Sequence, residues 1–233
     1  MNPYSQNKVL GTSKDSLVSD IYLMDCIEGM KEYPDKYFDL AIVDPPYGIG
    51  MDGGSIGKGK KLSKKNWDSE TPNEEYFNEL FRVSKNQIIW GGNYFKLPLT
   101  KSWVYWDKMQ DGFAETFSSG ELAWSSFNLP MKQIRYKYQG NYEGYENNIT
   151  TKSSKPHLLK IHPTQKPVAL YKWILDKYAK QGDKILDTHL GSASSRIATY
   201  DLNFDFTGFE LDPEYIEKST IRFNNHINQL TLF

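Results

Sequence analysis

The sequence predicts an α/β fold built on an open, mostly parallel sheet, and three apolar segments lead to this prediction. The run at 38–43 is rich in aliphatic residues and stops at two prolines, which cannot continue a sheet ladder. A shorter run at 184–187 precedes a turn of small residues and a helical stretch through Tyr200, and a third run occupies 204–210. Strands that alternate with helices are typical of parallel sheets, which bind ligands at the carboxyl ends of their strands.

The other predicted elements follow from local patterns along the chain. Residues 20–24 are expected to form a strand. The segment 73–84 has acids in its first turn and apolar residues at helical spacing, and it leads into a strand at 87–90. Strands at 103–106 and 122–127 are expected to pair across a connection that contains Gly112. Prolines in the first turn predict helices at 167–178 and from Pro213 to about Asn225.

Four residues directly after the strand at 38–43 form a candidate site. They are Asp44, Pro45, Pro46 and Tyr47. An amino group conjugated to a purine or pyrimidine ring is a poor nucleophile, and acceptors for both of its N–H groups would localise its lone pair. The Asp44 carboxylate and the Pro45 carbonyl can accept these bonds, while the Tyr47 ring can stack on the base. The alternative interpretation is an ordinary strand followed by a proline turn.

A turn of small residues follows the strand at 184–187. Because the turn contains Gly191 and few bulky side chains, a ligand could approach its backbone closely. The next predicted strand ends at Glu210, in the window after the turn where nucleotide-binding βαβ units carry a carboxylate for the ribose. Glu210 is therefore the candidate for binding ribose hydroxyls.

Three motifs, taken in order, resemble the DNA amino-methyltransferases of the β class, whose motifs are circularly permuted. They are the tetrapeptide at 44–47, the segment His-Pro-Thr-Gln-Lys-Pro at 162–167 and the turn at 187–195. The segments at 90–95, 103–108 and 121–124 resemble phage-type members, so the resemblance spans almost the whole chain. It implies a Rossmann-like class I methyltransferase fold with a mixed, mostly parallel sheet of about seven strands, one reversed edge hairpin and helices on both faces.

The resemblance also implies roles for individual residues. The tetrapeptide would act on the target base. Asp25 would meet the adenine amine of the cofactor S-adenosylmethionine, and Thr164 and Lys166 would pack against its amino-acid moiety. The residues expected to bind this cofactor are Asp25, Asp44, Thr164, Lys166, Asp187, His189, Gly191, Ser192, Glu210 and Asp212.

The turn departs from the pattern of this family at several positions. The family commonly has an aromatic residue where His189 stands, a glycine where Ala193 stands, and threonines where Ser194 and Ser195 stand. Ala193 is expected to take an ordinary negative φ or a small strain, because a side chain disfavours the left-handed region. His189 is interpreted as a packing residue of the turn rather than a proton carrier.

A glycine-rich segment with five lysines follows the tetrapeptide and is expected to lack regular structure. Its position beside Tyr47 favours contact with phosphates near a flipped nucleotide, and a solvated loop without a partner is the alternative. The resemblance places a small target-recognition region at 130–161, where Arg135 could read a guanine edge or hold a phosphate. The candidate DNA-binding residues are Lys58, Lys60, Lys61, Lys64, Lys65 and Arg135.

Composition agrees with an intracellular globular enzyme. The 233 residues suffice for a single α/β domain, and a net charge of −1 confines any nucleic-acid surface to a local patch. Cys26 is the one cysteine of the chain, which excludes an intramolecular disulfide and a thiolate-rich zinc site. No apolar run is long enough to span a membrane, so a cytoplasmic protein is expected.

These features predict a site-specific methyltransferase that acts directly on adenine N6 of a base flipped out of double-stranded DNA, without a metal. Adenine is favoured because an acid leads the tetrapeptide, whereas cytosine N4 enzymes of this family more often begin with serine. Cytosine N4 is one alternative, and a DNA-binding partner subunit without catalysis is another. Methylation of RNA or of a glutamine amide is less favoured, since those relatives usually begin with asparagine. A homodimer and a cognate restriction enzyme are the further candidate partners.

Overall fold

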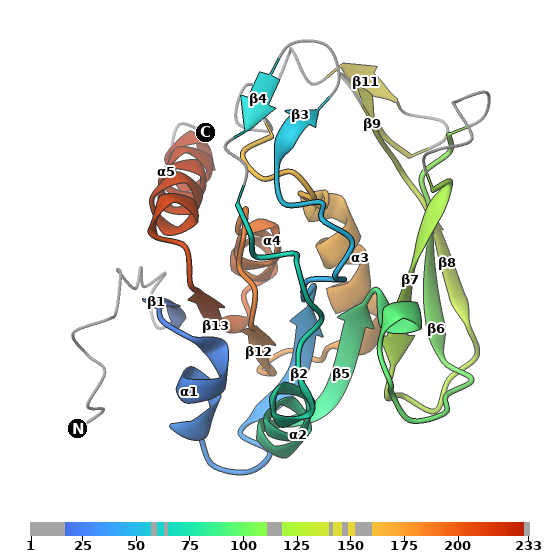
Figure 1. The fold of residues 1–233 in the computed structure, drawn as a ribbon, viewed down its shortest axis with the longest axis vertical. Helices are drawn as coiled ribbons and strands as arrows, with labels where there is room; N and C mark the ends of the chain where they lie inside the picture. Colours follow the sequence, from blue (N-terminus) through green and yellow to red (C-terminus); the bar gives the residue numbers. More distant parts are fainter. Residues whose placement is uncertain are drawn as a thin grey trace.

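An eight-stranded mixed sheet forms the centre of the protein (Figure 1). The computed structural model describes residues 17–56, 60–62, 65–110, 118–139, 142–145, 149–151 and 160–230. The strands lie in the order β1 (Ser19–Leu23), β13 (Asp205–Glu210), β12 (Lys184–Asp187), β2 (Phe38–Val43), β5 (Ser84–Trp90), β7 (Gly120–Ser125), β6 (Trp103–Asp107) and β8 (Lys132–Arg135).

The sheet confirms the predicted α/β class and its mostly parallel character. Only β7, among the eight, runs against its neighbours, because it pairs antiparallel with both β5 and β6 while the other adjacent strands pair in parallel. The sheet has eight strands rather than about seven, since β8 arises inside the segment 130–161 and pairs with β6. The reversed strand also lies inside the sheet rather than in a hairpin at its edge. The expected pairing of β6 with β7 is confirmed, and Gly112 lies outside the described residues.

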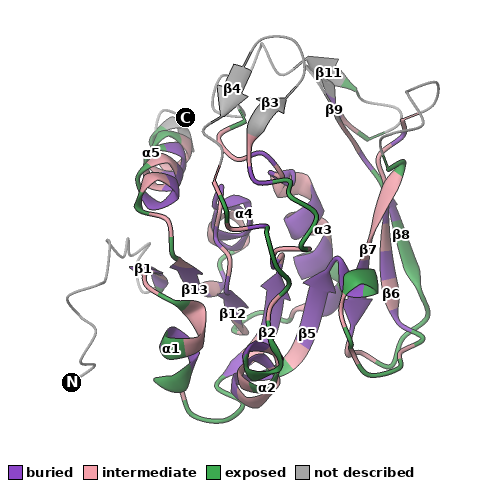
Figure 2. Ribbon diagram, viewed as in Figure 1, coloured by how far each residue is buried: buried purple, intermediate pink, exposed green. Residues whose placement is uncertain are grey.

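Helices cover both faces of the sheet, and the alternation of side chains along each strand separates the two cores. Leu40 and Ile42 of β2 belong to the core formed with α3 (Val168–Tyr178), α4 (Ser194–Asp201) and α5 (Pro213–Leu230). Ala41 and Val43 belong to the core formed with α1 (Cys26–Lys31) and α2 (Glu74–Val83). Because both faces are covered, the central strands are buried along most of their length (Figure 2).

The chain leaves the centre of the sheet in two directions. From β12 it passes through α4 to β13, whereas from the adjacent β2 it passes through α2 to β5 on the other side. A parallel sheet leaves a crevice outside the carboxyl ends of two such strands, and ligands bind there. Asp44 follows β2 directly and Asp187 ends β12, so the two motifs predicted from the sequence meet at this point.

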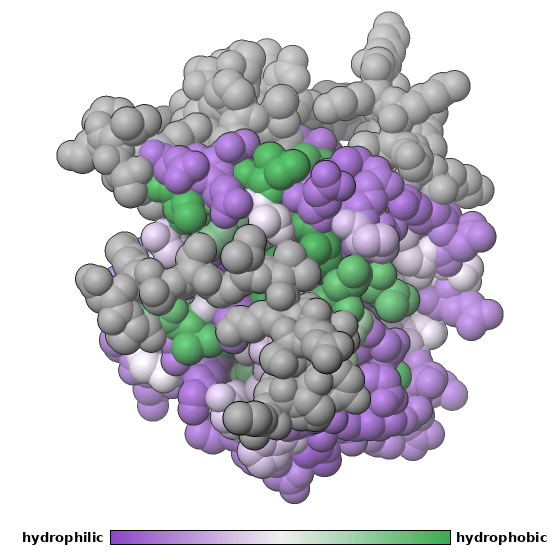
Figure 3. Space-filling model, turned by 90° about the vertical axis from the view of Figure 1, so that its left-hand side faces the viewer, coloured by the Kyte–Doolittle hydropathy of each residue, from purple (hydrophilic) through white to green (hydrophobic). Residues whose placement is uncertain are grey.

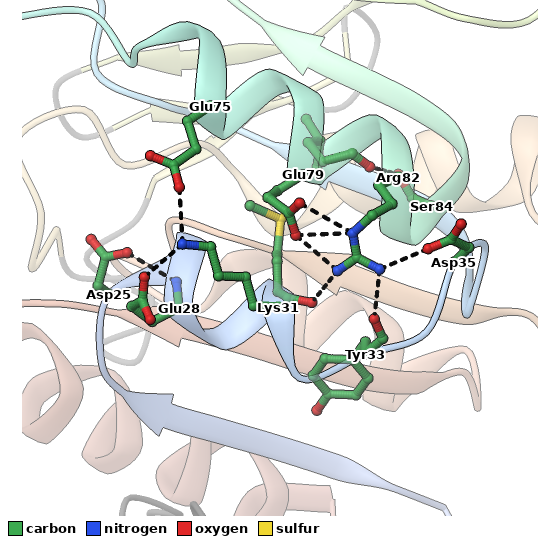
Figure 4. Close-up of polar contacts among 11 residues, drawn as sticks. Asp25, Glu28, Lys31, Tyr33, Asp35, Glu75, Glu79, Arg82 and Ser84 are labelled. Carbon is green, nitrogen blue, oxygen red and sulfur yellow. Dashed lines mark hydrogen bonds and ion pairs between the residues drawn. The ribbon is translucent and has the colours of Figure 1, made fainter.

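Polar contacts hold α1 against α2 (Figure 4). Arg82 pairs with Glu79 at 2.8 Å and donates to the carbonyl of Met30, in the last turn of α1, at 3.0 Å. Lys31 bridges one glutamate from each helix at 2.9 Å. At the other end of α1, the Asp25 carboxylate caps the first turn by accepting two backbone N–H groups. These contacts therefore fix the position of Asp25 beside the crevice.

Smaller elements stand above the main sheet. Strands β9 (Lys137–Gln139), β10 (Tyr142–Gly144) and β11 (Thr150–Thr151) form a three-stranded sheet, and Gly92–Tyr94 forms the short 3-10 helix η2. The lysine-rich segment was expected to lack regular structure, and this prediction is wrong. It contains an antiparallel pair of strands, β3 (Gly54–Ile56) and β4 (Lys60–Leu62), because its backbone can pair across a glycine-rich connection.

The described helices include none that is long and apolar enough to cross a membrane. Figure 3 shows the face on the side of α1 and α5, where hydrophilic side chains cover most of the visible described surface. Hydrophobic side chains on that face occur in separate groups between them.

Candidate active site

A cavity of about 1150 Å³ opens at the carboxyl ends of β1, β2, β12 and β13. Among the residues predicted from the sequence, Asp187 is the one cofactor candidate that does not line it, because its carboxylate is buried behind the turn. The predicted residues that do line the cavity are Asp25, Asp44, Pro45, Pro46, Tyr47, Lys65, Thr164, Lys166, His189, Gly191, Ser192, Glu210 and Asp212.

The Asp44 carboxylate is held by two donors inside this cavity. The Tyr47 hydroxyl donates to Asp44 Oδ1 at 2.6 Å, and Lys166 Nζ donates to Oδ2 at 2.5 Å. Lys166 Nζ also lies 3.2 Å from the Tyr47 hydroxyl oxygen and 3.1 Å from Glu121 Oε2. The Lys166 ammonium thus donates hydrogen bonds to Asp44 and Tyr47, and it forms an ion pair with Glu121. The sequence placed Lys166 against the amino-acid moiety of a cofactor, and the structure places its charge against the tetrapeptide.

Burial and charge together set the ionisation of this cluster. Burial lowers the pKa of Lys166, but the carboxylates of Asp44 and Glu121 outweigh burial and raise it above its usual value. Burial raises the pKa of Glu121, while Lys166 and Lys108 lower it more strongly, to about 2. Burial raises the pKa of Asp44, and Lys166 opposes that effect. Lys166 therefore stays cationic and Glu121 stays anionic at neutral pH, and this ion pair stands beside Asp44.

Stacking and a glycine position the Tyr47 ring. The ring lies on that of Tyr94 with centroids 5.0 Å apart and planes 12° from parallel. Gly91 faces the edge of the same ring and has a φ of +68°, a conformation that side chains rarely adopt. The turn after β5 thus places the Tyr94 ring against one face of the Tyr47 ring, and Gly91 leaves room at the edge of the Tyr47 ring.

Replacing Gly91 by alanine is expected to displace Tyr47 and lower stability. A Cβ at position 91 would lie 2.2 Å from Tyr47 Cε1 in addition to the strain of the positive φ. We expect the free energy of unfolding to fall by about 2 to 4 kcal/mol. Gly182→Ala is the matched control, because its φ is +89° and no atom lies within 4 Å of the added Cβ. Denaturant unfolding measures both variants, and equal losses would contradict a collision with Tyr47.

The turn after β12 is organised around two carboxylates, the buried Asp187 and the half-buried Glu210. Asp187 accepts from the Ser195 hydroxyl at 2.5 Å and from the His189 N–H at 3.0 Å, and burial raises its pKa to about 7. Glu210 accepts the N–H of Gly191 at 2.8 Å and two further backbone N–H groups just beyond β13. Because a carboxylate has about four lone-pair sites, Glu210 keeps acceptor capacity toward the cavity.

Ala193 adopts a φ of +57°, so the expectation of an ordinary negative φ is wrong. Its N–H donates to the carbonyl of Leu190 at 2.9 Å while its own carbonyl accepts from Ile197, and these bonds impose the left-handed conformation where α4 begins. The sequence had left a small strain as the other outcome, and this is what the turn contains.

The remaining cofactor candidates have local partners. His189 contacts the Thr188 hydroxyl at 2.9 Å and the ring of Tyr76, and burial lowers its pKa to about 4, as befits a neutral packing residue. Asp212 accepts the N–H of Glu214 in the first turn of α5. The hydroxyls of Thr164 and Ser192 contact His162 and Ser194, at 3.2 and 3.1 Å.

The candidate DNA-binding residues differ in where they lie. Lys58 and Lys64 lie outside the described residues, and Lys60 and Lys61 lie on β4. Lys65 turns toward the cavity instead of outward, because it pairs with Asp212 at 2.9 Å and Glu214 at 2.7 Å. Arg135 ends β8 with a 43% exposed side chain and pairs with Asp107 at 2.9 Å.

Sequence patterns did not single out four polar residues that line the cavity near the tetrapeptide. Glu121 lies on β7, and Lys108 lies just after the antiparallel neighbour β6. Their side chains form an ion pair at 2.6 Å. Tyr94 follows β5, and Asp68 follows the lysine-rich segment. Tyr94, Lys108 and Glu121 lie in segments that carry the family resemblance, which assigned them no role, and Asp68 has no local signal.

The chain matches one family model and is similar to two Type II methyltransferases. The family model described as DNA methylase matches residues 89–221 of the chain. The Type II methyltransferase M.HpaI of Haemophilus parainfluenzae is 27% identical, covering 87% of this chain and 73% of the relative. The Type II methyltransferase M2.MboI of Moraxella bovis is 25% identical, covering 88% of this chain and 87% of the relative.

Solved structures have the same fold. The M1.HpyAVI–SAM complex aligns with a TM-score of 0.53 and 19% identity, covering 88% of this chain and 98% of that protein. The PvuII DNA methyltransferase, which is cytosine-N4-specific, aligns with a TM-score of 0.52 and 15% identity, covering 90% of this chain and 92% of that protein.

Proposed function

The chain belongs to the family of DNA methylases, and we propose that it transfers a methyl group from S-adenosylmethionine to adenine N6 of a base flipped out of double-stranded DNA. One observation carries the proposal. The Asp44 carboxylate stands at the same crevice as Gly191 and Glu210, in a single cavity. A group that binds an amino group and a turn that can bind a nucleotide-like cofactor are thereby brought side by side.

The cavity suits S-adenosylmethionine in size and in the groups that line it. Its volume is at the upper end of the range for small-molecule sites, which leaves room for a base beside the cofactor. Glu210 would accept the ribose hydroxyls, and Gly191 allows close approach to the backbone. Asp25, fixed as the cap of α1, would accept the adenine amine. When bound, S-adenosylmethionine supplies an electrophilic methyl group.

The tetrapeptide would prepare the amino group of the base. Asp44 Oδ1, which holds the Tyr47 hydroxyl, would accept one N–H of the base, and the Pro45 carbonyl would accept the other. Tyr47 offers a ring face for stacking. These contacts localise the nitrogen lone pair and aim it, so positioning and fixed charge supply most of the acceleration. The proton then leaves a cationic, already methylated nitrogen, which needs no strong base.

Contacts with DNA are assigned by position and charge. We place target recognition at 130–161, which includes β8 to β11 (Figure 1). Arg135 is exposed enough to reach a base edge or a phosphate there. Lys60 and Lys61 on β4 would neutralise phosphates near the flipped nucleotide. We also propose that the protein forms a homodimer and that it acts alongside a cognate restriction enzyme. A monomeric mass in solution, both with and without DNA, would contradict the homodimer.

The identity of the methylated base tests the adenine assignment. Unmethylated genomic DNA is incubated with the protein and labelled S-adenosylmethionine, digested to nucleosides and separated by chromatography. We expect N6-methyldeoxyadenosine as the labelled product, because an acid leads the tetrapeptide. If N4-methyldeoxycytidine is the labelled product instead, the substrate base is cytosine and not adenine. Label in neither nucleoside, with cofactor bound, would overturn the proposed reaction.

A further inference from the structure

The carboxylate of Asp68 is buried and surrounded by backbone donors from the turn after the tetrapeptide. Asp68 Oδ1 accepts the N–H of Tyr47 at 2.7 Å and of Gly48 at 2.9 Å, and Oδ2 accepts the N–H of Met51 at 2.7 Å. Its backbone carbonyl accepts the N–H of Gly50 at 3.0 Å. The side chain is buried, with Asp68 only 2% exposed. Four contacts, from residues 47, 48, 50 and 51, therefore wrap this turn around one residue.

The backbone of this turn curls around the Asp68 carboxylate. Gly48 and Gly50 both have a φ of +71°, which lets the chain curl and point successive N–H groups inward. Such an arrangement of N–H groups is a concave anion site, and here a carboxylate of the same chain occupies it. Hydrogen bonds from N–H groups to a charged acceptor are stronger than neutral ones, so this contact dominates the local geometry.

Asp68 is itself held from the opposite side of the cavity. The neighbouring Trp67 ring stacks on His162 with centroids 5.1 Å apart, and His162 packs on Tyr215 of α5 at 4.4 Å. Lys65 pairs with two acids at the start of α5. The segment 65–68 thus spans the cavity from α5 to the tetrapeptide, and its far end is fixed to the helix that follows β13.

We propose that Asp68 is a positioning residue for Tyr47, holding the backbone of the base-stacking tyrosine in register with Asp44. This inference rests on the proposed function, since the position of Tyr47 matters for a base that must stack there. The N–H of Tyr47 is bonded to Asp68 while its hydroxyl is bonded to Asp44. Both ends of the residue are therefore fixed, and release of the backbone end lets the ring move relative to the acceptor.

Asp68→Asn tests the proposal with little change of shape. One amide oxygen can still accept two of the N–H groups, but the amide nitrogen then faces the remaining N–H. We expect the single-turnover rate of methyl transfer to DNA to fall about 10- to 100-fold, with an unchanged dissociation constant for S-adenosylmethionine. Hydrogen exchange of the amides of Tyr47, Gly48 and Met51, followed by mass spectrometry, should become faster in the variant.

Asp52→Asn is the matched control. Asp52 lies in the same segment and is 3% exposed, but among the described residues its Oδ1 has no hydrogen-bond partner, and it does not line the cavity. This variant should keep the wild-type rate and the wild-type exchange of residues 47–51. An equal loss of rate in both variants would assign the effect to general disturbance of the segment and overturn the proposal.

The exchange experiment separates this proposal from the proposed function. If wild-type protein does not methylate DNA, the function fails, while protection lost only in Asp68→Asn would still establish the anchor. If wild-type protein methylates DNA and Asp68→Asn matches its rate, the positioning role fails alone. Fast exchange of the three amides in wild-type protein would overturn the anchor even if the variant did not fold.

Discussion

Asp44→Ala is expected to reduce methyl transfer by at least about 100- to 1000-fold, the loss that follows removal of one preorganised group aimed at the reacting atoms. The variant removes the acceptor for the amino group and frees the Tyr47 hydroxyl from its 2.6 Å contact. Binding of S-adenosylmethionine should persist, because Glu210 and Gly191 keep their places on separate elements. Single-turnover rates on unmethylated DNA, with cofactor binding measured in parallel, check this outcome.

Asp39→Ala is the control for this loss. Asp39 lies on the same strand β2, but it pairs with Lys85 at 2.6 Å at the opposite end from the cavity. Its loss should cost stability alone, since exposed pairs contribute about 0 to 1 kcal/mol, and leave the rate near that of wild type. A rate for Asp44→Ala within threefold of wild type would remove Asp44 from the reaction.

Lys166→Met is expected to have the second largest effect, because it removes a buried cation that lies between the half-buried carboxylates of Asp44 and Glu121. Lys166 is 3% exposed in its side chain and contacts Asp44 at 2.5 Å and Glu121 at 3.1 Å. Breaking a buried pair by removing one partner costs about 3 to 5 kcal/mol, because the other charge stays buried. We expect the free energy of unfolding at pH 8 to fall by about that amount.

The sign of the pH dependence follows from the pKa of Glu121, which Lys166 and Lys108 hold at about 2 against the effect of burial. A lowered pKa stabilises the wild type above the unfolded value of 4.5, and this stability is lost as the pH falls toward 2. Without Lys166 the buried carboxyls take up protons more readily, so the deficit of the variant should shrink from pH 8 to pH 4.

Urea unfolding at these two pH values measures the change, with Lys172→Met as the control. Lys172 pairs with Asp201 at 2.6 Å but is 41% exposed in its side chain, so its loss should cost about 1 kcal/mol or less. Equal destabilisation by the two variants would show that Lys166 does not stabilise the cluster that it forms with Asp44 and Glu121.

Local patterns predicted the parts of this protein whose structure is decided within a few residues. The strand at 38–43 and the strand at 184–187 appear with the predicted bounds, because their aliphatic runs and their flanking prolines and small residues define both ends. The helix predicted at 73–84 is α2 (Glu74–Val83), and Asn73 caps its first turn. The parallel order of the central strands then brings Asp44, Gly191 and Glu210 to one edge.

Local patterns did not predict the contacts between segments that are distant in the sequence. Lys166 is 122 residues from Asp44, and nothing in its neighbourhood indicates that its ammonium contacts the Asp44 carboxylate. Asp68 acts on a turn 17 to 21 residues earlier, through backbone groups that leave no residue signature. The extra strand β8 owes its place to pairing with β6, since only Ile134 of its four residues is buried. Edge pairing of this kind depends on a partner strand and not on local propensity.

The central claim is that a cofactor bound in this cavity gives its methyl group to DNA held beside Asp44. Isotope trapping tests it most directly. The protein is loaded with labelled S-adenosylmethionine and mixed with unmethylated DNA together with an excess of unlabelled cofactor, and the label in DNA is counted after one turnover. We predict that label from bound cofactor appears in the DNA with wild-type protein and not with Asp44→Ala. Cofactor that binds but exchanges completely into solution, leaving the DNA unlabelled, would contradict the account.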